Sequence, residues 1–73
     1  MIELSQQQAN TLQLFLEGKT MKQMALTLGV SYSRIVNLLN EVLIKTGTKS
    51  RKELLIHGNE IEYVVKSAQN QEA

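Results

Sequence analysis

The chain is divided into short segments by residues that begin and end helices. Four segments begin with a hydroxyl residue that can cap a helix N-terminus, at Ser5, Thr20, Ser31 and Ser50. Glycine can adopt the left-handed conformation that closes a helix, and it ends the first three segments at Gly18, Gly29 and Gly47. Proline is absent. This pattern predicts a series of short helices joined by tight turns.

Capping boxes and apolar spacing support the same prediction. Three of the segments begin with the pattern Ser/Thr-x-x-Glu/Gln, in which two side chains cap one helix start. These pairs are Ser5 with Gln8, Thr20 with Gln23, and Ser50 with Glu53. Apolar residues then recur at intervals of three and four, which predicts one buried face on each helix. In the third segment this face comprises Ile35, Leu38, Leu39, Val42 and Thr46.

The end of the fourth segment admits more than one interpretation. Gly58 interrupts the apolar pattern, and a helix that continues through glycine loses about 1 kcal/mol relative to alanine. We favour helix throughout, with a fourth helix that is extended or bent at Gly58. A separate short helix over 60–66 is one alternative, and a strand is another because Ile61, Tyr63 and Val65 alternate.

Length and composition limit the class of protein. The 73 residues (8.2 kDa) are expected to form one all-α domain over residues 1–67, followed by a frayed polar tail over residues 68–73. Cysteine is absent and His57 is the single histidine, which argues against disulfides and a structural zinc site. There is no aspartate and no glycine-rich phosphate loop, so we expect no enzyme, no metal and no cofactor.

The chain is expected to be a cytoplasmic protein. Its uncharged apolar stretches are too short to span a bilayer, and no basic-then-apolar leader begins it. Charge is unevenly distributed although the net charge is only +1: residues 19–52 carry seven lysines and arginines against Glu41 alone, and both flanks are acidic. A basic centre between acidic ends suggests one surface for a polyanion and another for a different partner.

The second and third segments are joined by Leu28-Gly29-Val30-Ser31. Glycine permits a sharp turn, Val30 can fill the space between the helices, and Ser31 caps the next helix. With the small Ala25 at the crossing, this arrangement predicts a helix-turn-helix, whose second helix enters the major groove of DNA. An ordinary helical hairpin is the alternative.

Further motifs extend this pattern from Leu4 to about Leu55. They are Leu4-Ser5, Leu12-x-Leu14, Gly18-Lys19-Thr20-Met21-Lys22-Gln23-Met24-Ala25, Leu28-Gly29-Val30-Ser31, Ile35 with Leu39, Lys45-x-Gly47 and Arg51-x-Glu53. On these residues the chain resembles the LuxR/GerE-type helix-turn-helix family, the DNA-binding domain of many bacterial response regulators and quorum-sensing activators. The resemblance implies four helices with the third as recognition helix, dimerisation through the fourth, and binding to inverted half-sites near promoters.

The recognition helix departs from the family pattern. Where the family usually has Thr-Val-Lys-x-His, this chain has Arg34-Ile35-Val36-Asn37-Leu38, so a basic groove-facing residue is replaced by Val36 and a histidine by Leu38. Arg34 can restore a positive charge at the start of the helix. Glu41 would repel phosphate if it faced the duplex. These departures indicate a DNA target different from the usual one.

Base readout is assigned to one face of the third helix. The groove-facing set is predicted to be Ser33, Val36, Asn37 and Asn40. Asparagine can pair with adenine through two hydrogen bonds and valine can contact a thymine methyl group, so this surface would favour A·T steps. Phosphate contacts are predicted for Lys22, Ser31, Arg34, Lys45 and Lys49, whereas Arg51 is expected to bond back to the first helix.

The partners expected are double-stranded DNA and a second copy of the chain. The homodimer is predicted to form through the last helix, because that segment has more apolar residues than three helices can cover; its interface residues are Leu55, Ile61, Val64 and Val65. The alternative for this segment is that it folds back onto the first helix. A related regulator and RNA polymerase are further candidate partners, and no membrane or small-molecule ligand is expected.

Two functions follow from these observations. The first is a bacterial transcription regulator that binds promoter DNA as a dimer. The second is a protein-interaction module of the same fold, such as an anti-activator or adaptor that pairs with a related regulator; Val36, Leu38 and Glu41 favour it, and the basic centre argues against it.

Overall fold

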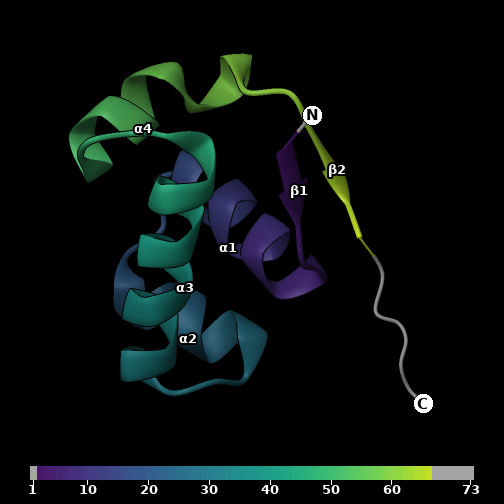
Figure 1. Ribbon diagram of the computed structural model, residues 1–73. Helices are drawn as coiled ribbons and strands as arrows, with labels where there is room; N and C mark the ends of the chain where they lie inside the picture. The colour runs from purple at the N-terminus through teal and green to yellow at the C-terminus, as the bar shows by residue number, and fades with distance from the viewer. Residues whose placement is uncertain (1, 67–73) are drawn as a thin grey trace.

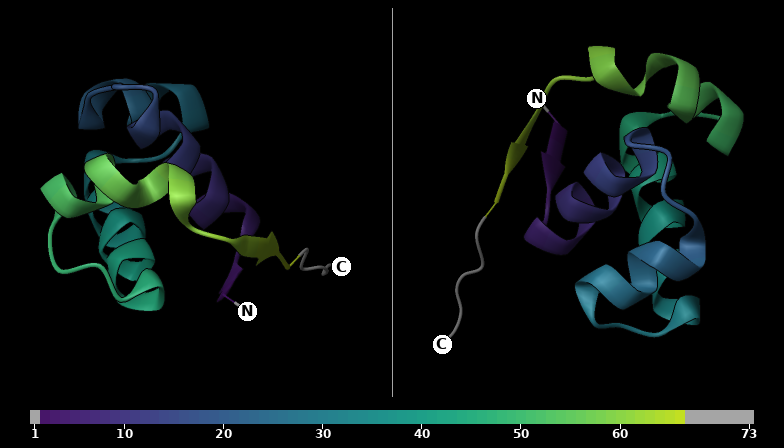
Figure 2. Two further views of the ribbon diagram at one scale, coloured as in Figure 1. Left: turned by 90° about the horizontal axis from the view of Figure 1, so that it is seen from above. Right: turned by 180° about the vertical axis from the view of Figure 1, so that it is seen from behind.

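The computed structural model describes residues 2–66, which form four α-helices, one short 3-10 helix and two short strands. The order is β1 (Ile2–Leu4), α1 (Gln6–Leu16), α2 (Met21–Leu28), α3 (Tyr32–Thr46), α4 (Arg51–His57), η1 (Gly58–Glu60) and β2 (Tyr63–Val65). Helix α3 is the longest and packs against both α1 and α2, while the two strands lie side by side beyond α1 (Figures 1 and 2).

The predicted helix starts are confirmed at all four hydroxyl residues. Full capping boxes form at Ser5 with Gln8 and at Thr20 with Gln23. The Ser50 hydroxyl accepts a hydrogen bond from the Glu53 backbone N–H at 3.1 Å. That last box is only half formed, because the Glu53 carboxylate accepts instead from the Lys49 backbone N–H at 3.3 Å.

Two clusters of buried side chains meet on α3. The first joins Leu4, Ala9 and Leu12 of the N-terminal segment to Leu39 and Val42 of α3 and to Leu54 of α4. The second joins Met24 and Ala25 of α2 to Ile35 and Leu38 of α3. Of the inward residues predicted from their spacing on α3, the four apolar ones are buried and Thr46, in the last turn, is half-buried. Helix α3 is therefore the central element, and its remaining surface is left for solvent.

The C-terminal part differs from the helix that we favoured. Helix α4 ends at His57, and residues 63–65 form strand β2, parallel to β1. The extended fourth helix is thus wrong, as is a purely α-helical fold, and the strand alternative is the one observed. Leu4 and Ile2 pair with Val65 and Tyr63, which supplies β2 with backbone partners that no residue near it in sequence could offer.

Gly58 has a packing role in this part of the fold. Its backbone is right-handed, with φ −59°, so no turn requires glycine there. A Cβ atom at this position would lie 2.5 Å from Cδ2 of Leu16, at the end of α1. Glycine therefore allows the end of α4 to approach α1 closely, and Ile61 can then pack on the first cluster.

Within residues 2–66, no helix is both long and apolar enough to cross a membrane. The frayed tail predicted over residues 68–73 lies outside the described residues.

Candidate nucleic-acid interface

The turn between α2 and α3 has the geometry that its sequence predicts. Gly29 is left-handed, with φ 69° and ψ 34°, and the Val30 backbone N–H donates to the Ala25 carbonyl oxygen at 3.0 Å. Ser31 then begins α3, its hydroxyl accepting a hydrogen bond from the Arg34 N–H at 3.0 Å. Because only three residues separate the helices, their relative placement is closely constrained.

Packing holds the two helices together behind the turn. Met24 is fully buried against Ile35 and Leu38, and the small Ala25 lies in the same cluster. Leu28 and Val30 pack at the edge of this cluster, so Val30 does fill space between the helices. The α2–turn–α3 unit is consequently a helix pair with its own hydrophobic core.

The predicted readout residues lie on the solvent side of α3. Successive residues of a helix are separated by about 100°, so a residue set at spacings of three and four shares one face. We call the face opposite the buried residues the outward stripe; it consists of Ser33, Asn37, Asn40 and Ile44, all exposed. Val36 lies at its margin and is half-buried. The stripe is therefore uncharged along its whole length.

Arg34 is directed toward α1. Its Nη2 atom donates a hydrogen bond to Oε1 of Gln7 at 2.9 Å, and the contact is exposed to solvent. Arg34 is close to the start of α3, where a phosphate contact was predicted. A guanidinium has five donors, so this single bond leaves others for a second acceptor.

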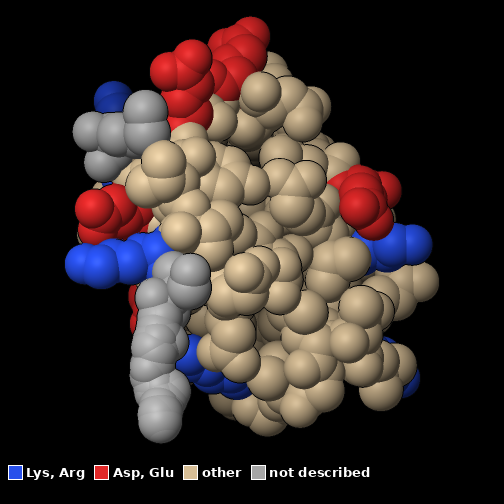
Figure 3. Space-filling model, turned by 90° about the vertical axis from the view of Figure 1, so that its right-hand side faces the viewer, with Lys and Arg blue, Asp and Glu red and all other residues tan. Residues whose placement is uncertain are grey.

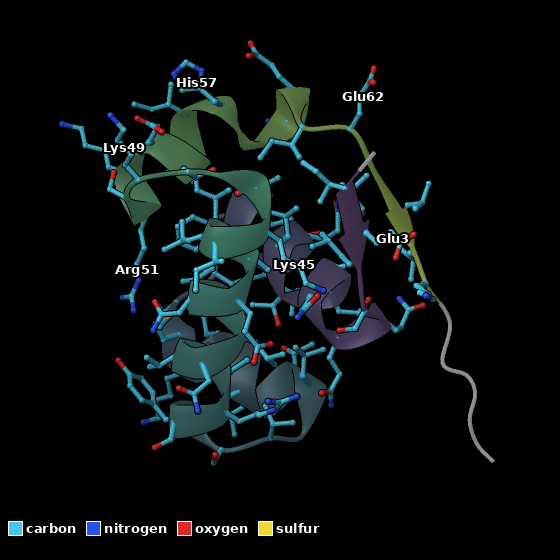
Figure 4. The ribbon with its side chains drawn as sticks, in the orientation of Figure 1. Glu3, Lys45, Lys49, Arg51, His57 and Glu62 are labelled. Carbon is cyan, nitrogen blue, oxygen red and sulfur yellow. The ribbon has the colours of Figure 1, made fainter. Side chains whose placement is uncertain are left out.

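Lys45 belongs to a polar cluster between α1 and α3. Its Nζ atom donates to Oε1 of Gln8 at 3.0 Å, and the same oxygen accepts from the Ser5 backbone N–H at 2.9 Å. Nε2 of Gln8 donates to Oε1 of Glu41 at 2.9 Å. Gln8 is only 7% exposed, and Figure 4 shows Lys45 pointing toward α1. Lys45 and Glu41 are thus both held on the α1 side of α3, away from the outward stripe.

The remaining predicted phosphate contacts divide between the two ends of α3. Ser31 is exposed at the start of α3, and Lys22 is exposed in the first turn of α2. Lys22 forms no side-chain hydrogen bond or ion pair with the described residues. Lys49 follows the other end of a helix about 22 Å long, beside α4 (Figure 4). Ser31 therefore lies at the N-terminal end of α3, Lys22 at the start of α2, and Lys49 beyond the C-terminal end of α3.

Arg51 does not take the position that we expected. Instead of bonding back to α1, it is exposed and points along α3 (Figure 4). With Lys49 and Lys52 it forms an exposed basic group around the start of α4. The sequence did contain a signal for this exposed basic group, because Arg51 belongs to a run of three basic residues within four positions. Sequence reasoning also missed Gln7 and Gln8 as the α1 partners of Arg34 and Lys45.

The four predicted dimer residues do not form one surface of a last helix. Leu55 lies on α4 and is 49% exposed, whereas Val64 and Val65 lie on β2 and are 44% and 40% exposed. Ile61 packs against the first core cluster. The prediction that these residues share one helix is wrong, because residues 61–65 are extended and Ile61 is partly buried in the fold. Tyr63 accordingly contacts α1, its hydroxyl accepting from Nε2 of Gln13 at 2.7 Å.

Comparison of the chain with protein-family models, with curated proteins and with solved structures finds no match. Among residues 2–66, no group of three or more histidines and carboxylates is placed to hold a metal ion.

Proposed function

We propose that this chain is a helix-turn-helix domain of the LuxR/GerE type that binds double-stranded DNA as a dimer and regulates bacterial transcription. The observation that carries the proposal is the outward stripe of α3. This helix follows the tight turn after α2, and the stripe presents Ser33, Asn37 and Asn40 to solvent. A helix about 10–12 Å in diameter fits the major groove, which is about 12 Å wide.

The chemistry of the stripe favours A·T base pairs. The carboxamide of asparagine can accept from N6 and donate to N7 of adenine, and the methyl groups of Val36 suit the methyl group of thymine. The absence of lysine and arginine from the stripe disfavours guanine, whose O6 and N7 are acceptors. Sequence preference would therefore depend on Asn37 and Asn40.

Attraction to phosphate would come from the flanks of the stripe. Lys22 is exposed without a partner among residues 2–66, and Arg34 has an exposed contact with a neutral glutamine. A hydrogen bond from guanidinium to phosphate is charge-assisted and is stronger than one to an amide oxygen. Arg34 would thus exchange Gln7 for phosphate when α3 docks.

Selection of bound sequences from a random DNA pool tests the readout. We expect enrichment of A·T steps by the wild-type chain, and loss of that enrichment in Asn37→Ala. Ile44→Ala is the matched control on the same stripe, because Ile44 is exposed but lies outside the predicted readout set. Enrichment that survives unchanged in Asn37→Ala would reject the docking of α3.

Charge reversal tests the phosphate contacts. Lys22→Glu and Lys52→Glu change the net charge equally, and both lysines are exposed. We expect Lys22→Glu to weaken DNA binding at least about tenfold. The slope of the logarithm of the binding constant against the logarithm of the salt concentration should become shallower by about one, whereas Lys52→Glu should have a smaller effect on both. Equal losses would indicate nonspecific attraction only.

Two observations favour a protein-interaction module as the second candidate. Ile44 is 79% exposed on the outward stripe itself, and Arg34 and Lys45 both donate to glutamines of α1. A stripe that is uncharged and ends in isoleucine also suits an apolar partner surface. A gel shift with random DNA at low salt separates the two functions: no shift, together with a defined dimer in light scattering, would favour the module.

A further inference from the structure

Strand β2 has one edge that no described element covers. The sheet has two strands, and β1 lies between β2 and α1 in Figure 1 and in the right-hand view of Figure 2. Uncharged side chains dominate the side of the molecule that Figure 3 presents, with the charged ones at its margins. The exposed edge of a strand presents backbone donors and acceptors that can pair with another strand.

The hydrogen bonds to β1 determine which backbone groups occupy this edge. The Lys66 N–H donates to the Leu4 carbonyl oxygen at 2.8 Å, so Lys66 directs its N–H toward β1. Backbone groups alternate between the two edges of a strand. Val64 therefore also faces β1, and the N–H and C=O groups of Tyr63 and Val65 face the free edge.

The charges around Val64 are complementary under a twofold rotation. Glu62 precedes Val64 by two residues and Lys66 follows it by two, and both side chains are exposed. In an antiparallel pair centred on Val64, Glu62 of each copy lies opposite Lys66 of the other, on the same face of the sheet as the two Val64 side chains. In the same register Tyr63 lies opposite Val65, and these are the residues whose backbone groups face the free edge.

We propose that the chain forms a homodimer by antiparallel pairing of β2 with β2 of a second copy, centred on Val64. The product is a four-stranded sheet in the order β1–β2–β2–β1. A twofold axis makes the same surface of both copies meet, which a self-complementary strand satisfies and a different protein need not.

The pairing uses side chains that the monomer leaves exposed. Val64 and Val65 are 44% and 40% exposed, and each would contact the second copy. Within the chain, Nζ of Lys66 lies 3.8 Å from Oε1 of Glu3. Because this ion pair is exposed, the Lys66 amine can also approach Glu62 of the second copy. Figure 4 shows the Glu62 side chain projecting from the molecule at the start of β2. The interface does not depend on DNA binding, and its failure would leave the α3 docking untouched.

A single cysteine tests the position of the twofold axis without DNA. Residues opposite each other in a non-hydrogen-bonded antiparallel pair have Cα atoms about 4.5 Å apart, which a disulfide can span. The chain has no cysteine of its own. We expect Val64→Cys to form disulfide-linked dimers at least about tenfold faster than Ile56→Cys, although Ile56, an apolar position on α4, is the more exposed of the two. Equal rates would overturn the proposal.

Charge exchange tests the register. In equilibrium sedimentation without DNA, Glu62→Lys should raise the dimer dissociation constant by about tenfold, because it replaces two attractive pairs with two repulsive ones. Lys66→Glu should do the same, and the double exchange should restore the wild-type value. Glu60→Lys, an exposed glutamate outside the paired register, is the control. A dimer that responds equally to Glu60→Lys and Glu62→Lys, or no restoration by the double exchange, would contradict this interface.

Discussion

The helix pair in the middle of the chain and the sheet formed by its first and last described elements depend on different kinds of interaction. In the α2–turn–α3 unit, caps, a left-handed glycine and apolar residues close in sequence determine the geometry. In the β1–β2 sheet, Ile2 pairs with Tyr63 and Leu4 with Val65, partners about sixty residues apart. Local interactions are readable from a short window of sequence, whereas strand pairing requires the intervening chain to be folded. The first region was predicted correctly and the second was not.

The core of the α2–α3 unit should account for the largest single effect on stability. Ile35 is fully buried, and Ile35→Ala should lower the free energy of unfolding by about 2–5 kcal/mol in urea denaturation, because it leaves a cavity beneath the turn. Ile44 is the control on the same helix, 79% exposed, and Ile44→Ala should change stability by less than about 0.5 kcal/mol. Similar losses at both positions would contradict the orientation of α3.

The capping interaction at the turn should have an intermediate effect. Ser31→Ala removes the hydroxyl that accepts from the Arg34 N–H, and we expect a loss of about 1 kcal/mol in the free energy of unfolding. Ser33→Ala, two residues into the helix, removes no cap and should be neutral or slightly stabilising. Thermal unfolding followed by circular dichroism compares the two. If Ser33→Ala is the more damaging change, the helix start is misplaced.

The sheet region should show the smallest effect. Tyr63→Phe keeps the ring against the first cluster and removes only the hydroxyl that accepts from Gln13, an exposed contact, so we expect a loss below about 1 kcal/mol. Hydrogen exchange should become faster at the Lys66 amide and remain unchanged at Ile35.

Tyr32→Phe is the control for this change. Tyr32 is 57% exposed, and its hydroxyl forms no hydrogen bond within residues 2–66, so this variant should match the wild type. Faster exchange throughout α3 in Tyr63→Phe would show that the sheet and the helix pair unfold together.

The candidate site was predictable to the extent that helix periodicity governs it. Ser33, Asn37 and Asn40 lie on the solvent side of α3 as their spacing from Ile35 and Leu39 requires. The positions of long cationic side chains were not predictable in the same way. Arg34 and Lys45 each contact a glutamine of α1, and those contacts depend on how α1 lies against α3. The prediction for Arg51 was wrong because a bond back to α1 depends on how α4 lies relative to α1, and the structure leaves this side chain exposed.

The sequence alone determined where the four helices begin, where the first three end, which face of α3 is buried, and the shape of the turn at Gly29, because each depends on residues within a few positions of one another. Only the tertiary structure decided that residues 63–65 are a strand. Ile61, Tyr63 and Val65 alternate, which permits a strand, but the choice between helix and strand required β1 as a hydrogen-bonding partner and α1 as an apolar support. Those partners lie beside β2 only after the four helices have packed.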